Sequence, residues 1–233
     1  MINKINKDCG KSHALPPIIV RRRAGAATGA LLCFQNLVFP AVLGRSGRTM
    51  LKREGDGSTP LGTMKLLGGF YRADRLHLPP TRLAMEPIRP DMGWCDAPDH
   101  ACYNSLVRLP LAASHEKMLR DDRLYDICLV LDWNISQRRR HRGSALFWHL
   151  SQESGRPPEG CIAIAPQAML QLLPWFRSLR RRGADVLVGD PGRAYRPLEN
   201  LAALAVYEVP VTRALEDSEV KKTTVWRFEE SAG

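Results

Sequence analysis

The chain has 233 residues, of which 44% are hydrophobic, so it can bury a full core in one domain with appendages or in two small domains. Its formal charge of +10 attracts polyanions, but the arginines lie in scattered clusters without aromatic stacking platforms, which argues against a nucleic-acid partner. The six cysteines are irregularly spaced and include no C-x-x-C pair, which argues against a zinc ribbon and a dithiol redox motif.

No stretch contains the roughly 18–20 apolar residues that a membrane-spanning helix needs. The nearest candidate, residues 28–44, contains Gln35, Asn36 and Pro40. It follows three arginines at 21–23, so a secretion signal must be considered. Its last residues, 39–44, are however typical of a strand that enters a turn, and no small-residue cleavage site stands out. We therefore expect no transmembrane segment and favour no cleaved leader.

In chain order, the sequence begins with a polar, lysine-bearing segment, residues 1–16, that we expect to be flexible. From residue 18 the apolar runs are short and separated by turn residues, which favours strands over helices. The proline-rich residues 72–109 are typical of an elaborated loop. Strands are expected at 18–20, 30–34, 37–44, 63–71, 126–134, 145–150, 161–165 and 183–189, with a turn-rich loop at 54–62.

After residue 165 the apolar spacing becomes helical. Pro166 suits the first turn of a helix over the next fourteen residues, and Pro174 is expected to kink it. A second helix is plausible at 198–209. The sequence therefore predicts a mainly β domain with one or two helices, an α+β class, over residues 17–190. A C-terminal extension, residues 191–233, follows it.

His149 ends one apolar run and Cys161 begins the next. Both runs are apolar on each face, so both residues could simply belong to the core, where free cysteines are common. The connecting residues 151–160 are polar and rich in Gly, Pro and Ser, and they are expected to cross the surface. If the two strands pair as an antiparallel hairpin, His149 and Cys161 face each other at one rim of the sheet.

That arrangement favours a catalytic interpretation of the pair. The thiolate is the nucleophilic form of cysteine, so a thiol needs an adjacent base. Gly160 lets the backbone before Cys161 turn sharply and aim N–H groups at a developing oxyanion. One hairpin would then supply the nucleophile, the base and the oxyanion donors.

Residues 94–104 gather two cysteines, two aspartates and a histidine. This mixture is not a standard zinc set, and its prolines and alanines are typical of a loop, so we predict neither a metal site nor a cofactor. A disulfide between Cys95 and Cys102 would require an oxidising compartment, so the sequence leaves that bond open.

The order F-x-H, a loop, then P-x-x-G-C with small and aliphatic residues after it resembles the YkuD-type L,D-transpeptidase catalytic domain. Upstream, Lys52 and the stretch GDGSTPLG at 55–62 are similar to the K-x-x-G-D-G-x-T-P-x-G stretch of one branch of that family. The resemblance covers residues 17–190. Further similar stretches are Leu43-Gly44-Arg45-Ser46-Gly47, Trp94-Cys95-Asp96, Tyr103-Asn104, and Arg120-Asp121-Asp122 with Leu124-Tyr125-Asp126.

The resemblance implies a β-sandwich-like catalytic fold in which a cysteine attacks a stem-peptide carbonyl of peptidoglycan. An acyl-enzyme forms, and an amine of a second stem resolves it into a 3–3 or a 1–3 crosslink. On matching positions, Cys161 is the nucleophile, His149 the general base and Gly160 the backbone oxyanion donor. The substrate contacts that we expect beside them are Trp148, Arg156, Pro158, Glu159 and Tyr125.

Three side chains depart from the usual family pattern. The family usually has Ser or Thr three residues before the cysteine and often His two before, where this chain has Pro158 and Glu159. Two residues after the cysteine, where Asn or Arg is frequent, this chain has Ala163. The spacing from histidine to cysteine is also shorter. These differences bear on the choice of donor and acceptor rather than on the attacking atom.

Two alternatives remain beside the transpeptidase. Water could resolve the acyl-enzyme, which would make the protein an L,D-carboxypeptidase or another cell-wall amide hydrolase. A non-catalytic cell-wall-binding protein would keep the fold alone, although the intact pair of Cys161 and His149 disfavours it. The resemblance also implies a role in cell-wall biogenesis and cell shape, and carbapenems as inhibitors. It places the protein in the periplasm or cell envelope, or in the cytoplasm if the substrates are recycled wall fragments.

Overall fold

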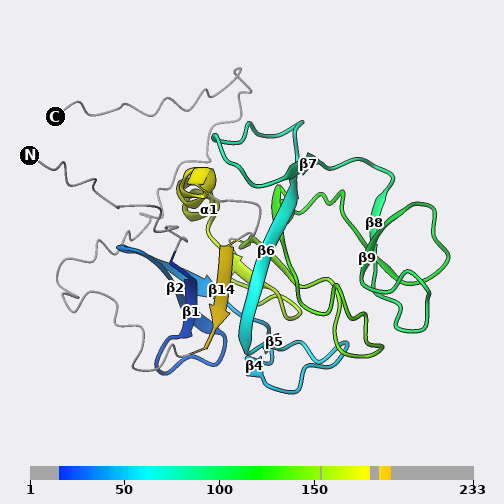
Figure 1. Cartoon of the computed structure of the whole chain (residues 1–233), viewed down its shortest axis with the longest axis horizontal. Coiled ribbons are helices and arrows are strands. Elements are labelled where there is room, and N and C mark those ends of the chain that lie inside the picture. The colour runs from blue at the N-terminus through cyan, green and yellow to red at the C-terminus, as the bar shows by residue number, and fades with distance from the viewer. Residues whose placement is uncertain (1–15, 153, 179–183, 190–233) are drawn as a thin grey trace, which may run out of the picture.

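The computed structural model describes residues 16–152, 154–178 and 184–189, and strands dominate it (Figure 1). The expected flexible segment, apart from residue 16, and the C-terminal extension with its helix lie outside these ranges. Within them, no helix is long and apolar enough to cross a bilayer. The strands are β1 (Ile18–Arg22), β2 (Gly29–Phe34), β3 (Leu37–Val42), β4 (Arg48–Thr49), β5 (Thr59–Pro60), β6 (Gly62–Tyr71), β7 (Met85–Pro87), β8 (Met92–Cys95), β9 (Ser105–Arg108), β10 (His115–Lys117), β11 (Ile127–Leu131), β12 (Phe147–Leu150), β13 (Ile162–Ile164) and β14 (Ala184–Val188).

One nine-stranded sheet forms the main body, in the order β11-β12-β13-β3-β2-β1-β14-β6-β7. An additional pairing between β11 and β6 closes the sheet on itself, so its two facing layers belong to one continuous sheet. The large side chains between them, among them Phe34, Phe39 and Trp148, are fully or almost fully buried. The predicted class, mainly β with helix, is confirmed.

The helix begins at Pro166 as predicted, but its α-helical part ends before Pro174 instead of continuing through a kink. Helix α1 (Pro166–Leu172) has Pro166 in its first turn, where the missing N–H has no intrahelical partner to lose. It passes into a 3-10 helix, η1 (Leu173–Ser178), one residue before Pro174. Proline cannot donate the next α-helical hydrogen bond, so the α-helix ends there. The buried face of α1 consists of Ala168, Met169 and Leu172.

The expectation that residues 72–109 form an irregular loop needs correction. This segment contains β7, β8 and β9, and β8 lies between β9 and β10 in a separate three-stranded sheet. Figure 1 shows β8 and β9 on the opposite side of β6 from β1 and β2. The strands are only three or four residues long, β7 ends in Pro87, and β8 and β9 lie between prolines, so the proline signal hid them.

The antiparallel hairpin predicted for β12 and β13 is also wrong, because the two strands are parallel and His149 lies opposite Ala163. Hairpin loops usually have 2–5 residues, whereas parallel neighbours need about ten or more to bring the chain back to the same end of the sheet. Residues 151–161 provide that length. Both strands are buried throughout, which is typical of parallel pairing.

The turn after β3 touches the backbone that precedes β13. A methyl group on Gly44 would lie 2.3 Å from the carbonyl oxygen of Gly57 and 2.7 Å from the Cα of Gly160. Both neighbours are backbone atoms, so no side chain can rotate away. Gly44 therefore allows three segments to meet directly beneath Cys161, the residue after Gly160.

We predict that Gly44→Ala will separate these segments and destabilise the protein by about 1–3 kcal/mol, the usual range for an overpacked site. Thermal denaturation would measure the loss, and alkylation of Cys161 would show whether its position changes. Gly55→Ala is the control, because a methyl group there meets no atom within 4 Å although its φ of +70° is unfavourable. Equal behaviour of the two variants would contradict the close approach.

Candidate active site

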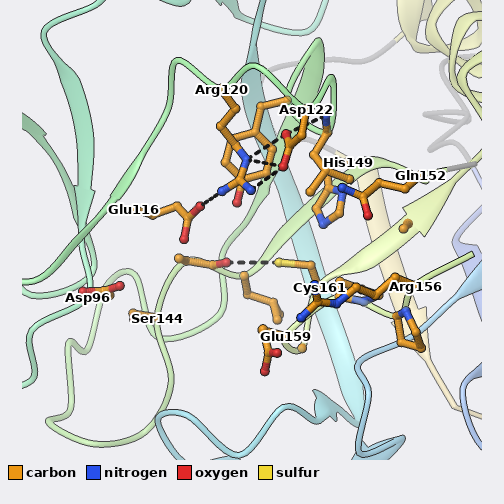
Figure 2. Close-up of a pocket in the computed structure, with 18 of the residues that line it drawn as sticks. Asp96, Glu116, Arg120, Asp122, Ser144, His149, Gln152, Arg156, Glu159 and Cys161 are labelled. Carbon is orange, nitrogen blue, oxygen red and sulfur yellow. Dashed lines mark hydrogen bonds and ion pairs between the residues drawn. The ribbon is translucent and has the colours of Figure 1, made fainter. Parts of the chain in front are cut away.

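A cavity of about 490 Å³ opens beside the end of β12 and the start of β13. Seven of the residues predicted from the sequence line it, and Figure 2 shows His149 and Cys161 among the side chains around it. Those seven are Tyr125, His149, Arg156, Pro158, Glu159, Gly160 and Cys161.

Trp148 is the exception. Its side chain is fully buried in the main core, because successive residues of a strand point to opposite faces and His149 takes the face toward the cavity. Its indole nitrogen is buried without a hydrogen-bond partner in the described part of the chain. The prediction of Trp148 as a substrate contact is therefore wrong.

The parallel register sets the relation between the two candidate catalytic residues. Ala163 lies opposite His149, and Cys161 is two residues earlier on the same face of β13. Two residues of a parallel strand span about 6.6 Å along its axis. His149 and Cys161 therefore share one face of the sheet and one cavity, offset along the strands instead of directly paired.

Backbone groups hold the thiol of Cys161 in this structure. The thiol donates a hydrogen bond to the carbonyl oxygen of Ala145 at 3.3 Å and accepts one from the N–H of Phe147 at 3.3 Å. Burial raises the pKa of Cys161 to about 12, although the Phe147 hydrogen bond and the charge of Lys52 act in the opposite direction. The thiol is therefore neutral near pH 7.

His149 is neutral as well. Its Nδ1 lies 2.8 Å from the carbonyl oxygen of Leu150, which can only accept, so Nδ1 carries the proton and Nε2 remains available as an acceptor. Burial lowers the pKa of His149 to about 4. At neutral pH this imidazole is a base with one free nitrogen, in the same cavity as a protonated thiol.

The backbone at Gly160 turns sharply, as the sequence predicts. Its φ is +121°, which side chains rarely allow, and a Cβ there would lie 3.0 Å from the carbonyl oxygen of Ser58. The same Cβ would lie 3.3 Å from the Nζ of Lys52, so a cation stands beside the peptide that precedes Cys161. Lys52 is 5% exposed, and its Nζ contacts Asp56 at 2.5 Å.

The K-x-x-G-D-G-x-T-P stretch holds the backbone at Cys161 in place through hydrogen bonds. Asp56 accepts hydrogen bonds from Lys52, from the N–H of Arg53 and from the N–H of Ser58, which fixes the loop. The buried Thr59 accepts a hydrogen bond from the N–H of Gly44 at 2.8 Å and donates one to the carbonyl oxygen of Cys161 at 3.3 Å. The motif thus positions both the cation and the backbone of the cysteine.

A chain of charged side chains forms another wall. Arg120 pairs with Glu116 on one side and with Asp122 on the other, and its guanidinium lies 5.1 Å from the ring centre of Tyr125 (Figure 2). The Tyr125 ring packs edge-on against His149, with ring centres 5.5 Å apart. The resembling stretch around Arg120 and Tyr125 therefore holds the imidazole and brings charge to the cavity.

The loop before Cys161 is attached to the turn after β3. The N–H of Arg45 donates to the carbonyl oxygen of Pro158 at 2.8 Å, and the Arg45 side chain pairs with Glu159 at 2.5 Å. Both side chains of this pair are more than half exposed, so the ion pair contributes little energy, and the backbone hydrogen bond is the firmer attachment.

The YkuD L,D-transpeptidase catalytic domain is the family whose model matches residues 32–193 of this chain, well over half of its length. The chain belongs to this family. A solved structure, L,D-transpeptidase 1 of Mycobacterium tuberculosis, is similar at 13% identity with a TM-score of 0.32, covering 75% of this chain and 62% of that one. The chain thus spans less than two thirds of that protein. No curated protein matches the chain.

Asn104 supports the site of this YkuD domain through Ala145 without lining the cavity, and the sequence indicated it only as part of a similar stretch. It is fully buried, and its side-chain oxygen accepts hydrogen bonds from the Trp94 indole at 3.0 Å and from the N–H of Ala145 at 3.1 Å. Its amide nitrogen donates to the carbonyl oxygen of Trp133 at 3.0 Å. Ala145 has a φ of +48°, unusual for a residue with a Cβ, and it accepts the thiol hydrogen bond of Cys161.

The cysteines of the 94–104 segment have a local role in the YkuD domain. Cys95 and Cys102 are both free thiols. The Cys95 sulfur lies 3.7 Å from Nδ1 of His100, which also accepts the N–H of Cys102 at 3.1 Å. These contacts close the turn that places Asn104 beneath Ala145.

We predict that Asn104→Ala will destabilise the protein by about 1–3 kcal/mol, because it leaves buried donors unsatisfied. It will also change the rate at which Cys161 reacts with iodoacetamide, and the pH dependence of that rate, because Ala145 loses its support. Ser105→Ala is the control: it removes a hydrogen bond to Cys102 from the next residue without touching Ala145. A folded Asn104→Ala protein with wild-type Cys161 reactivity would show that Asn104 only stabilises the fold.

Proposed function

We propose that this YkuD domain is a cysteine-dependent L,D-transpeptidase that forms an acyl-enzyme with a peptidoglycan stem peptide. It then transfers the acyl group to an amine of a second stem, in a 3–3 or a 1–3 crosslink. The observation that supports it most strongly is the neutral, singly available Nε2 of His149 in one cavity with the thiol of Cys161. The family membership supports the reaction class.

The first half of the reaction breaks an amide bond. The Cys161 sulfur attacks the carbonyl carbon of the donor stem while its proton passes to Nε2 of His149. The tetrahedral oxyanion then collapses, the carbon–nitrogen bond breaks, and the departing amine takes the proton from His149. A thioester remains on Cys161.

The pKa values determine how this step proceeds. A thiol with a pKa of about 12 and an imidazole with a pKa of about 4 do not exchange a proton by themselves. Proton transfer must therefore accompany bond formation, as in general-base catalysis. The Lys52 ammonium and the peptide at Gly160 lie where they stabilise the developing negative charge.

The second half reverses these roles. The amine of the acceptor stem attacks the thioester, gives its proton to His149, and the carbon–sulfur bond breaks with return of the proton to Cys161. Acidic residues outnumber basic ones around the cavity, which favours approach of a positively charged amine; this amine loses one proton to solvent before its neutral form attacks. The acidic residues are Glu54, Asp96, Glu116, Asp122 and Glu159, and the basic ones are Lys52, Arg120 and Arg156.

This proposal places the protein at the cell envelope, where peptidoglycan is crosslinked. Fractionation of the native protein tests the location. Recovery in the cytoplasm would favour a hydrolase that trims recycled wall fragments.

Acylation is expected to lose activity on the acid side near pH 4, because burial lowers the pKa of His149 to about 4 and the base must be neutral. A solvated imidazole would instead lose its activity near pH 6.5. The rate of acyl-enzyme formation, followed by mass spectrometry across this range, measures the midpoint. Loss of activity near pH 6.5 would contradict a buried neutral imidazole as the base.

The fate of the acyl-enzyme tests the reaction class. Intact-protein mass spectrometry with a carbapenem is expected to show one adduct, absent in Cys161→Ala and retained in Cys102→Ser, the matched control for a free thiol outside the cavity. Purified muropeptides are then supplied with and without an added D-amino acid.

Amine-linked products would support the transpeptidase, and their masses identify the acyl donor as stem residue one or three. Shortened stems under every condition would contradict the transpeptidase and support an L,D-carboxypeptidase instead. A chain that forms no adduct and no product would leave only the non-catalytic, wall-binding alternative.

A further inference from the structure

Two large apolar side chains project side by side from the surface directly after β4. Met50 is 81% exposed and Leu51 is 72% exposed. The other exposed large hydrophobic residues of the described chain are Leu67, Leu106 and Trp175. Each is less than half exposed, and none adjoins another in sequence. Single exposed apolar residues are ordinary, but an adjacent pair this exposed marks a candidate contact surface.

The pair borders a groove of about 520 Å³ that is separate from the catalytic cavity and shares only Lys52 with it. Trp133 and four residues of the loop 136–142 also line the groove, namely Ser136, Gln137, Arg139 and Arg142. Apolar, aromatic and cationic groups therefore meet on one face of the molecule.

The fold holds the backbone of this basic loop in place. The Trp133 indole donates to the carbonyl oxygen of Arg142 at 2.9 Å, and Asn134 exchanges hydrogen bonds with the backbone of Arg139 at 2.8 and 3.0 Å. The N–H of Glu54 donates to the carbonyl oxygen of His141 at 3.0 Å. Every residue from 136 to 142 is nevertheless exposed. The loop is anchored through its backbone while its side chains face solvent.

The arginines of this face are poorly compensated. Arg140 has one exposed partner, Asp99, at 3.5 Å. In the described part of the chain, no ion pair neutralises Arg138, Arg139 or Arg142. One carboxylate, Asp132, also lines the groove, where it accepts the N–H of Lys65. The net charge of the face is therefore positive.

We infer that this face docks on the surface of a bilayer with anionic headgroups. Met50 and Leu51 enter the boundary between headgroups and acyl chains, while Arg138, Arg139 and Arg142 bind lipid phosphates. Apolar side chains flanked by arginine are the composition of interfacial membrane contacts. A soluble polyanion would use the arginines but not the exposed Met–Leu pair, so the combination favours lipid.

Co-sedimentation of the full chain with vesicles tests the inference. Vesicles of phosphatidylcholine alone are compared with vesicles that also contain phosphatidylglycerol. Wild-type protein is expected to sediment with the anionic vesicles, and less so at high salt. Each arginine near the surface is expected to contribute roughly fivefold to the affinity, so Arg139→Gln with Arg142→Gln weakens binding about twenty-fivefold.

Met50→Ser with Leu51→Ser is the decisive variant, and Leu67→Ser with Leu106→Ser is its matched control on exposed residues elsewhere. The first pair is expected to weaken vesicle binding at least tenfold and the control pair to leave it unchanged. None of these four residues lines the catalytic cavity, so turnover of soluble muropeptides stays at the wild-type level in both.

Three results would overturn the inference. They are equal binding of wild-type protein to neutral and anionic vesicles, failure to bind either, and vesicle binding by the Met50/Leu51 variant that matches the wild type. The last result, together with tight heparin binding that depends on Arg139 and Arg142, would assign the face to a soluble polyanion.

Discussion

The hydroxyl of Thr59 connects the segments on which the site depends. It accepts a hydrogen bond from the N–H that follows β3 and donates one to the carbonyl oxygen of Cys161, so one buried side chain fixes both backbones. A hydroxyl can perform both roles at once, and no apolar side chain of similar size could replace it without leaving two buried polar groups unsatisfied. Gly44 makes the arrangement possible, because any Cβ there would collide with Gly57 and Gly160. The position of Cys161 is therefore a property of the folded backbone.

Burial determines the chemistry that this backbone makes available. The same desolvation that raises the pKa of Cys161 lowers that of His149, so the resting cavity contains two neutral groups. Such a site resists unspecific thiol chemistry, since the thiolate fraction at neutral pH is small. In the mechanism we propose, it reacts when a substrate carbonyl lies close enough for the sulfur–carbon bond to form as the proton moves. Lys52 and the Phe147 N–H favour the negative charge at that moment, and both are already in place.

Most strands were predictable from the sequence, because short apolar runs between turn residues are a local signal. Several of the residues that carried the family resemblance do line one cavity, among them Lys52, Tyr125 and Cys161. The direction in which two strands pair is not a local property of either strand. The hairpin predicted for β12 and β13 was therefore wrong, although the eleven-residue connection already favoured a parallel pair. The side of a strand on which a residue points follows from register, which explains why His149 reaches the cavity and Trp148 does not. The support that Asn104 gives to Ala145 joins residues forty-one positions apart, and no pattern within either segment indicates it.

The departures from the family pattern before Cys161 fit these contacts. The groups that touch the thiol are the carbonyl of Ala145 and the N–H of Phe147, both from the backbone, so they do not depend on the side chains at 158 and 159. Pro158 contributes its carbonyl oxygen, which proline keeps, to the N–H of Arg45, and proline also restricts the chain before Gly160. Glu159 points its carboxylate to Arg45 at the rim of the cavity. A shorter connection between histidine and cysteine is tolerated because it is attached to the turn after β3, which the Gly44 contact already holds against the same peptide.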